Sequence, residues 1–124
     1  MTRKPWLGES GAAAAEIALS LPILVGLVFG SVELSRYLGA QNDLQYAVEY
    51  ASRCAAVDQI KCGTASGTQA YAASMASQSG INPNDFTVAT QSCGYSVSVN
   101  YTMTSVIPGL LPFNPSISAS SCHP

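Results

Sequence analysis

One continuous apolar segment near the N-terminus constrains this chain more than any other feature. Its sequence, AAAAEIALSLPILVGLVFGSV, covers residues 12–32, and Glu16 carries the only charge in these 21 residues. As an α-helix the segment extends roughly 32 Å, enough to cross the hydrocarbon core of a bilayer. A buried core helix can be equally apolar, but the rest of the 124-residue chain has no element large enough to surround one. We therefore predict a transmembrane helix over residues 12–38.

The charges on either side of the apolar segment predict its orientation. Arg3 and Lys4 precede it, and Glu33, Arg36 and Asp43 follow its core. By the positive-inside rule, residues 1–11 stay in the cytoplasm as a leader and residues 39–124 are exported. A cleaved secretory signal is the main alternative, with a cleavage site of small residues at Val28-Phe29-Gly30. The apolar segment is longer than most signal cores and passes directly into another helical pattern, which favours a retained anchor.

The helical pattern continues beyond the apolar segment and becomes amphipathic. Apolar residues recur in steps of three and four, which marks one face of a helix: Tyr37, Ala40, Leu44, Ala47, Val48, Ala51 and Ala55. Polar residues occupy the opposite side: Gln41, Asn42, Asp43, Gln45, Glu49, Ser52 and Arg53. One helix is therefore expected to continue to about residue 57, with a kink or loosening at Pro22, which lacks an amide donor.

The rest of the chain predicts a shorter helix followed by a small antiparallel sheet. We expect a loop over residues 58–64 and a helix over residues 68–79, whose apolar face is formed by Ala70, Tyr71, Ala73, Met75 and Ala76. Residues 95–104 alternate strictly between apolar and polar side chains, which is typical of a half-buried strand. Residues 86–91 and 116–121 predict two further strands, with a turn at Cys93-Gly94. The fold class is therefore α+β, with the long helix covering the sheet.

The connection between the last two strands is unusually apolar for a loop. Residues 105–115 contain three prolines together with four large apolar side chains, Ile107, Leu110, Leu111 and Phe113. Packing onto the domain's own sheet is one explanation. We predict that part of this loop contacts the membrane surface or an assembly partner.

Four cysteines indicate an oxidising, exported setting. No two of them are spaced as C-x-x-C, since they lie at Cys54, Cys62, Cys93 and Cys122. Neither a zinc ribbon nor a thioredoxin-type site is therefore supported. Three pairings are possible. We favour Cys54–Cys62, because a helix end and the following loop are close together, and Cys93–Cys122, because both residues fall at strand ends. Four free buried thiols are the alternative.

The sequence offers no group of residues that predicts catalysis, a cofactor or a metal site. His123 is the only histidine. A lone histidine is expected to be solvated rather than to act as a metal ligand or a general base. Asp58 and Asp85 lie in separate predicted loops, so nothing in the pattern pairs them. Five Lys and Arg residues and a net charge of −2 do not provide the basic surface of a nucleic-acid-binding protein. We predict neither a nucleic-acid partner nor a small-molecule substrate.

A short motif at the start of the apolar segment resembles a type IV prepilin-like processing site. The residues are Gly11-Ala12-Ala13-Ala14-Ala15-Glu16-Ile17, after a short basic leader. Together with SGAAAAEIALSLPILVGLVFGSVELSR and YSVSVNYTMTSVIPGLLPFNPSISASS, they make the chain similar to the TadE-like family of tight-adherence (Flp-type) pilus assembly. In that family a Gly precedes the cut and an acidic residue is fifth in the mature chain. Here these are Gly11 and Glu16, although Ile17 stands where the family usually has an aromatic residue.

The resemblance implies a pilin-like, non-catalytic protein. It would be a membrane-anchored minor pilin or pseudopilin in the bacterial inner membrane, cut between Gly11 and Ala12 by a prepilin-type peptidase. Its partners would be other pilin or pseudopilin subunits and the pilus assembly machinery. Glu16 is costly in lipid, so it is expected to find a partner such as the Ala12 ammonium, although a helix N-terminal cap is the simpler role. The alternative is a secreted, disulfide-stabilised binding module released by ordinary signal peptidase.

Overall fold

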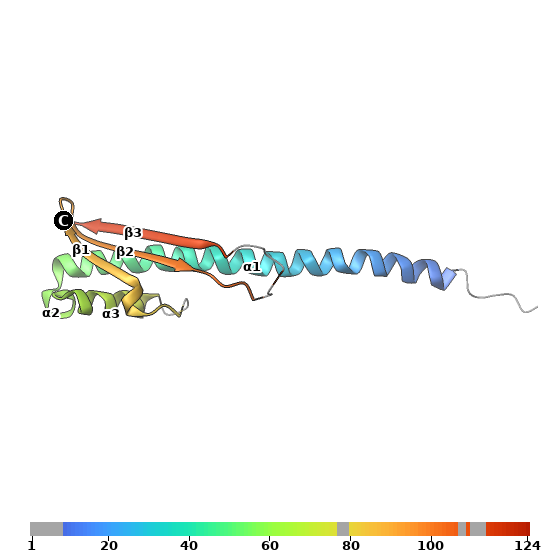
Figure 1. Ribbon diagram of the computed structural model, residues 1–124, viewed down its shortest axis with the longest axis horizontal. Coiled ribbons are helices and arrows are strands. Elements are labelled where there is room, and N and C mark those ends of the chain that lie inside the picture. Colours follow the sequence, from blue (N-terminus) through green and yellow to red (C-terminus); the bar gives the residue numbers. More distant parts are fainter. Residues whose placement is uncertain (1–8, 77–79, 107–108, 110–113) are drawn as a thin grey trace, which may run out of the picture. The chain divides into compact units, whose positions relative to one another are not determined.

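The computed structural model describes residues 9–76, 80–106, 109 and 114–124 (Figure 1). Its elements in chain order are helices α1 (Glu9–Val57), α2 (Gln59–Cys62) and α3 (Ala65–Met75), the 3-10 turn η1 (Pro83–Asp85), and strands β1 (Phe86–Gln91), β2 (Gly94–Thr102) and β3 (Ser116–His123). This order confirms the predicted α+β fold, with a long N-terminal helix, a shorter helix and three strands. The chain forms two units, Met1–Ser35 and Arg36–Pro124, and α1 contributes to both.

Several predictions fall on residues that the structure does not describe. They concern the basic leader residues Arg3 and Lys4 and the last residues of the expected second helix, 77–79. The four large apolar side chains of the 105–115 loop are also outside the described residues: Ile107, Leu110, Leu111 and Phe113.

The sheet of the second unit is antiparallel throughout, with β2 between β1 and β3. Val99 of β2 pairs with Phe86 on one side and with Ala119 on the other, and all three side chains are buried. Val97 and Ile117 are buried on the same face, because side chains two residues apart in a strand share a face. The apolar residues of the predicted 95–104 alternation therefore form the inner face of the sheet.

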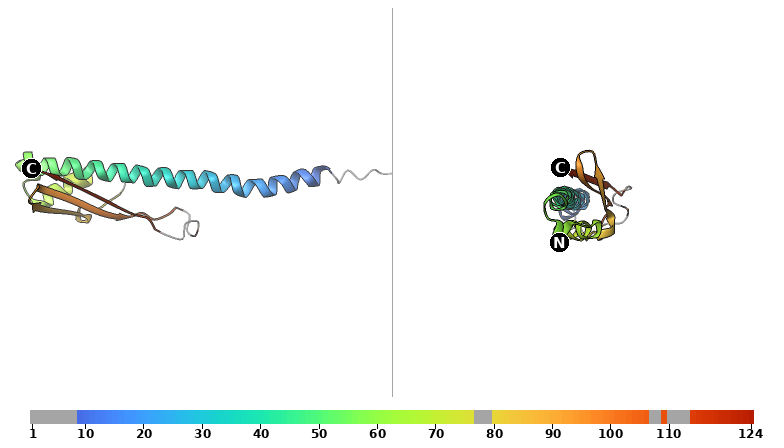
Figure 2. Two further views of the ribbon diagram at one scale, coloured as in Figure 1. Left: turned by 90° about the horizontal axis from the view of Figure 1, so that it is seen from above. Right: turned by 90° about the vertical axis from the view of Figure 1, so that its left-hand side faces the viewer.

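Helices α1 and α3 cover that inner face (Figure 2). The predicted α1 stripe is confirmed, since Leu44, Ala47, Val48 and Ala51 are fully buried in the same apolar cluster as the strand residues. Small alanines at 47 and 51 allow the helix to approach the strands closely. α1 is also joined to β3 by a 3.2 Å hydrogen bond between the Ser52 and Ser121 hydroxyls.

Helix α3 is joined to the other edge of the sheet. The Gln69 Nε2 atom donates a 2.7 Å hydrogen bond to the carbonyl oxygen of Phe86, the first residue of β1. The buried residues of α3 are Thr68 and Ala72, and the C-cap residue Ala76 is buried as well. The predicted apolar face is corrected here, because Ala70 is exposed and Ala72 is the residue that reaches the core.

The expected loop over residues 58–64 is also wrong in part, because it contains the single helical turn α2. The Asp58 carboxylate caps this turn by accepting hydrogen bonds from the amides of Ile60 and Lys61, both 3.1 Å. Thr64 then caps α3 by accepting a 3.1 Å hydrogen bond from the Gly67 amide, so α3 begins three residues before the predicted position. Side-chain caps of this kind satisfy amides that have no partner inside the helix.

Both favoured disulfides are present in the structure. Cys54–Cys62 joins the end of α1 to α2, and Cys93–Cys122 joins the β1–β2 turn to the end of β3. The turn consists of Ser92 and Cys93, so Gly94 is already the first residue of β2, at φ +117°. A side chain at Gly94 would collide with the carbonyl oxygen of His123, which explains glycine at this position.

We expect both disulfides in protein recovered from the exported compartment. Peptide mapping without reductant should return the linked pairs Cys54–Cys62 and Cys93–Cys122 and no free thiol. Loss of either bond by a double Cys→Ser change should lower the free energy of unfolding by about 2–4 kcal/mol. Crossed pairs, or four free thiols, would contradict this prediction.

Candidate membrane and assembly segment

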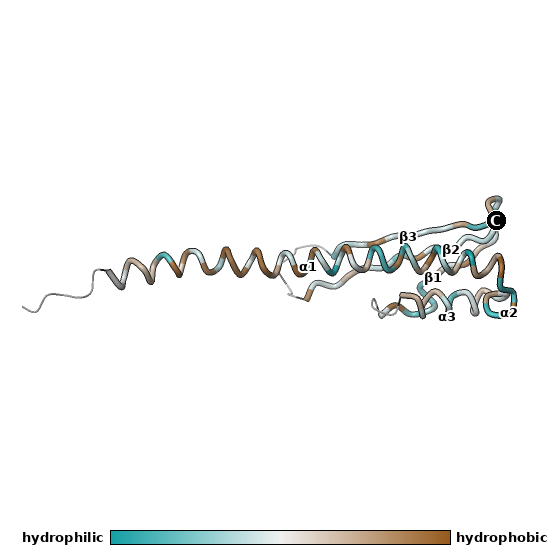
Figure 3. Tube along the Cα trace, turned by 180° about the vertical axis from the view of Figure 1, so that it is seen from behind, coloured by the Kyte–Doolittle hydropathy of each residue, from teal (hydrophilic) through white to brown (hydrophobic). Residues whose placement is uncertain are grey.

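The first half of α1 exposes an apolar surface on all sides. Every residue from Gly11 to Val32 is exposed, including Leu19 at 75% and Leu27 at 67%. The brown stretch of α1 in Figure 3 marks this segment, and its most apolar 18-residue window has a mean hydropathy of 2.1. By length and composition, among the described residues this is the one helix that is able to cross a membrane.

The predicted processing site lies in the first turns of α1. Gly11 and Ala12 are helical and exposed, and a methyl side chain at Gly11 would meet no heavy atom within 4 Å other than neighbouring backbone. The first four amides of a helix have no partner inside it, so the first turn unwinds at low cost. Opening of this turn would expose the predicted Gly11–Ala12 cleavage bond.

Glu16 lies one turn beyond the predicted cut. Its side chain is exposed, and within the described part of the chain its carboxylate has no hydrogen bond or ion pair. In contrast, Glu33 near the other end of the predicted span is only 5% exposed. An unpaired carboxylate at membrane depth costs about 2.5–3.5 kcal/mol or more, so a partner for Glu16 is expected if it enters the bilayer.

Pro22 lies within the same segment. α1 continues through Pro22, which has no amide to donate to the carbonyl of Ala18. An apolar hollow of about 350 Å³ lies along this stretch, lined by Ile17, Ser20, Leu21, Ile23, Leu24 and Leu27. The Ser20 hydroxyl turns back to its own helix, 3.4 Å from the carbonyl oxygen of Ile17. Side chains of an adjacent membrane helix or lipid are able to fill such a hollow.

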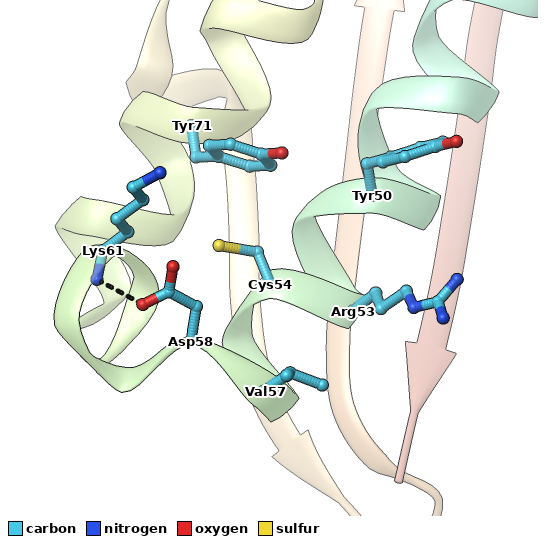
Figure 4. A pocket seen from close by; sticks show the side chains of 7 residues that line it. All are labelled: Tyr50, Arg53, Cys54, Val57, Asp58, Lys61 and Tyr71. Carbon is cyan, nitrogen blue, oxygen red and sulfur yellow. Dashed lines mark hydrogen bonds between the residues drawn. The ribbon is translucent and has the colours of Figure 1, made fainter.

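A pocket that the sequence analysis did not identify lies in the second unit (Figure 4). It is an open cavity of about 290 Å³ between the end of α1, α2 and α3, lined by Tyr50, Arg53, Cys54, Val57, Asp58, Lys61 and Tyr71. The sequence assigned Arg53 to the polar face of a helix and Tyr71 to an apolar face, so nothing in the periodicity brought them together. The favoured Cys54–Cys62 pairing was the one signal that these segments meet.

One wall of this pocket is reinforced by an aromatic pair on α1. The Tyr46 and Tyr50 ring centroids lie 4.2 Å apart, with the planes tilted by 36°. A hydrogen bond with Tyr50, followed by desolvation, raises the pKa of Tyr46 above its ordinary value. The two rings therefore lie against each other on the surface of α1.

Comparison with known proteins identifies the N-terminal part of the chain. The family described as TadE-like protein matches residues 11–53. Residues 11–53 form a TadE-like segment. This confirms the family resemblance over these residues and associates the segment with proteins of tight-adherence pili. No curated protein and no solved structure matches the chain.

The TadE-like segment coincides with particular structural features. It begins at Gly11, the residue before the predicted cut, and ends at Arg53, which lines the pocket. It includes Glu16, the exposed apolar half of α1, and most of the buried stripe that packs against the sheet. The similarity noted over residues 95–121 lies outside the matched segment. Among the described residues no three His, Cys, Asp or Glu side chains gather where a metal ion would bind.

Proposed function

We propose that this protein is a membrane-anchored minor pilin or pseudopilin that takes part in assembling a tight-adherence pilus. The observation that carries this proposal is that the TadE-like match covers a helix whose first half is apolar and exposed on every side. Such a surface is unfavourable in water and is covered in a bilayer or in a bundle of equivalent helices. The second unit has its own disulfide-bonded core, which suits an exported domain.

The proposal assigns a role to each part of the chain. Residues 1–11 are a cytoplasmic leader that a prepilin-type peptidase removes, and residues 12–38 are the membrane helix. Residues 39–124 form the exported domain, on the far side of the bacterial inner membrane. Assembly then brings together the N-terminal helices of neighbouring subunits, and the exported domains dock against one another or against the assembly machinery.

Glu16 is proposed to direct the packing of neighbouring helices. Cleavage after Gly11 creates an ammonium group on Ala12, and that of the same or a neighbouring subunit is the appropriate partner for an exposed carboxylate one turn away. The alanines at 13, 14 and 15 are small enough to let another helix approach. Neutralising two charges that would otherwise enter lipid unpaired favours the packed state.

Changing Glu16 to alanine tests this role. We expect cleavage after Gly11 to continue, because the residues at the cut are unchanged. Cross-linking between N-terminal helices in membranes should fall about 5–30-fold, which corresponds to about 1–2 kcal/mol per interhelical polar contact. Surface pili should decrease in parallel.

Ser31→Ala is the matched control, because the Ser31 hydroxyl contacts only its own helix among the described residues, at the carbonyl oxygen of Val28, and Ser31 does not line the apolar hollow. It should leave both cross-linking and pili at the level of the unchanged protein. Normal assembly of the Glu16→Ala protein would contradict the role of Glu16. Normal pili after deletion of the whole protein would contradict the proposed function itself.

A further inference from the structure

Strand β3 leaves one edge of the sheet open. It pairs with β2 on one side, and the sheet of the described residues has no strand on its other side. Figure 1 shows β3 as the outermost strand, with none of the described helices beyond it. The side chains of Ser116, Ser118 and Ser120 are exposed along this strand.

The register determines which backbone groups of β3 point toward the open edge. The Met103 amide donates a 3.0 Å hydrogen bond to the Pro115 carbonyl oxygen, in the same register that pairs Tyr101 with Ile117. Hydrogen-bonded pairs alternate along an antiparallel ladder, so the odd-numbered residues of β3 bond to β2. The even-numbered residues direct their amide and carbonyl groups to the open edge: Ser116, Ser118, Ser120 and Cys122.

The opposite edge of the sheet supports this assignment. Phe86 of β1 pairs with Val99, and Val99 pairs on its other side with Ala119. Val99 bonds to β3, so the backbone groups of Phe86 point away from the sheet. There the Phe86 carbonyl oxygen accepts the 2.7 Å hydrogen bond from Gln69 of α3. Helix α3 thus occupies part of the β1 edge, whereas no side chain of the described helices bonds to the even-numbered residues of β3.

β3 also lacks the features by which proteins protect an exposed edge. Protected edge strands are short, are interrupted by proline or a bulge, or carry charged side chains. β3 has 8 residues, pairs without interruption from Ser116 to His123, and contains no Lys, Arg, Asp or Glu. An edge of this kind favours pairing with another extended chain.

We propose that the open edge of β3 binds an extended, uncharged segment of a partner protein, which adds a fourth strand to the sheet. A row of outward amides and carbonyls is matched in spacing by another strand. The cross-strand neighbours of that strand would be Ile117 and Ala119 on one face and the exposed serines on the other. A segment that alternates apolar and small polar residues therefore fits best.

The direction of the chain argues against a second copy as the occupant. Two identical edges related by a two-fold axis pair antiparallel, which would reverse α1 of one copy relative to the other. Copies anchored in one membrane have their α1 helices in the same direction. This step rests on the membrane anchor of the proposed function, whereas the open edge itself does not.

Amide hydrogen exchange of the full-length chain in detergent micelles, read by NMR, provides the test. The probe is the acetylated, amidated peptide Thr-Val-Thr-Val-Thr. Without it, the amides of Ser118 and Ser120 should exchange faster than those of Ala119 and Ser121, which bond to β2. A saturating amount of peptide should slow exchange at Ser118 and Ser120 about 2–10-fold, the effect of one backbone hydrogen bond. The same peptide methylated on every amide nitrogen is the control and should have no effect.

Variants of Ser118 identify the edge. Ser118→Pro removes an outward amide that β2 does not use, and proline is tolerated at such an edge position. It should weaken peptide binding about 2–10-fold. Ser118→Ala keeps the amide and should bind as the unchanged protein does. Slow exchange at Ala119 in both variants would show that the β2–β3 ladder is intact.

Four results would overturn the proposal. They are no slowing of exchange by the peptide, equal slowing by the methylated peptide, unchanged affinity in the Ser118→Pro variant, and slowing with protein concentration alone. The last would make a second copy of the chain the occupant. None of these measurements requires pili, so their failure would leave the proposed function standing.

Discussion

Replacing Gly11 with phenylalanine should abolish cleavage between residues 11 and 12 and leave the leader attached. The peptidase must approach the backbone closely at this position, and only glycine presents no side chain there. Gly11 has open space around it, so the larger side chain fits without disturbing α1. N-terminal sequencing of the membrane fraction is expected to return Ala12 from the unchanged protein and leader residues from the variant.

Gly30→Phe is the matched control and also separates the two export routes. Gly30 has open space as well, and it is the last residue of the alternative cleavage site for ordinary signal peptidase. We expect prepilin-type cleavage after Gly11 to continue in this variant. An unchanged protein that begins at Ser31 and is no longer cut in the Gly30→Phe variant would support the secreted binding module. A chain that retains Thr2 in cells with active prepilin peptidase would contradict processing at Gly11.

The sequence predicted those elements whose hydrophobic period is long and regular. Most of the strict alternation of residues 95–104 became β2, which ends at Thr102. The three- and four-residue steps from Tyr37 to Ala55 became the inward face of α1. The 4-residue helix α2 was missed because one turn is too short to show a period. Its signal was a capping residue, Asp58, and Thr64 gave the same signal for the start of α3.

Strand β3 shows why element ends are harder to predict than elements. It was expected to end at Ser121 but continues to His123, because His123 pairs with Tyr95 at the start of β2. Cross-strand pairing joins residues far apart in sequence, and no local pattern contains it. The disulfide Cys93–Cys122 lies at the same end of the sheet and holds the extra residues in register.

The two candidate sites differ in the same way. Gly11, Ala12 and Glu16 are consecutive or one turn apart, so their relation was visible in the sequence. The pocket combines side chains from α1, α2 and α3, and it exists because the chain reverses after Val57 and the Cys54–Cys62 disulfide fixes that reversal. Periodicity placed Arg53 and Tyr71 on helix faces without saying which faces would meet.

Changing Phe86 to alanine should remove much of the stability of the second unit. Phe86 is fully buried at the start of β1, where it contacts the apolar cluster shared by α1, α3 and the sheet. Loss of a buried aromatic side chain costs about 3–5 kcal/mol, partly from lost burial and partly from the cavity left behind. A small domain has only about 5–15 kcal/mol in total, so the variant should unfold at a much lower urea concentration.

The Ile60→Ala variant tests whether the loss of stability comes from burial of the side chain rather than from its hydrophobic character alone. Ile60 is also a large apolar residue, but it is 98% exposed on α2, so its removal should change the free energy of unfolding by no more than about 0.5 kcal/mol. The comparison comes from urea unfolding of both full-length variants in one detergent, with tyrosine fluorescence as the readout. A Phe86→Ala midpoint within error of the Ile60→Ala midpoint would mean that the sheet does not pack on the helices through Phe86. In that case the close approach of α3 to β1 would depend on the hydrogen bond from Gln69 to the Phe86 carbonyl, which the alanine variant retains.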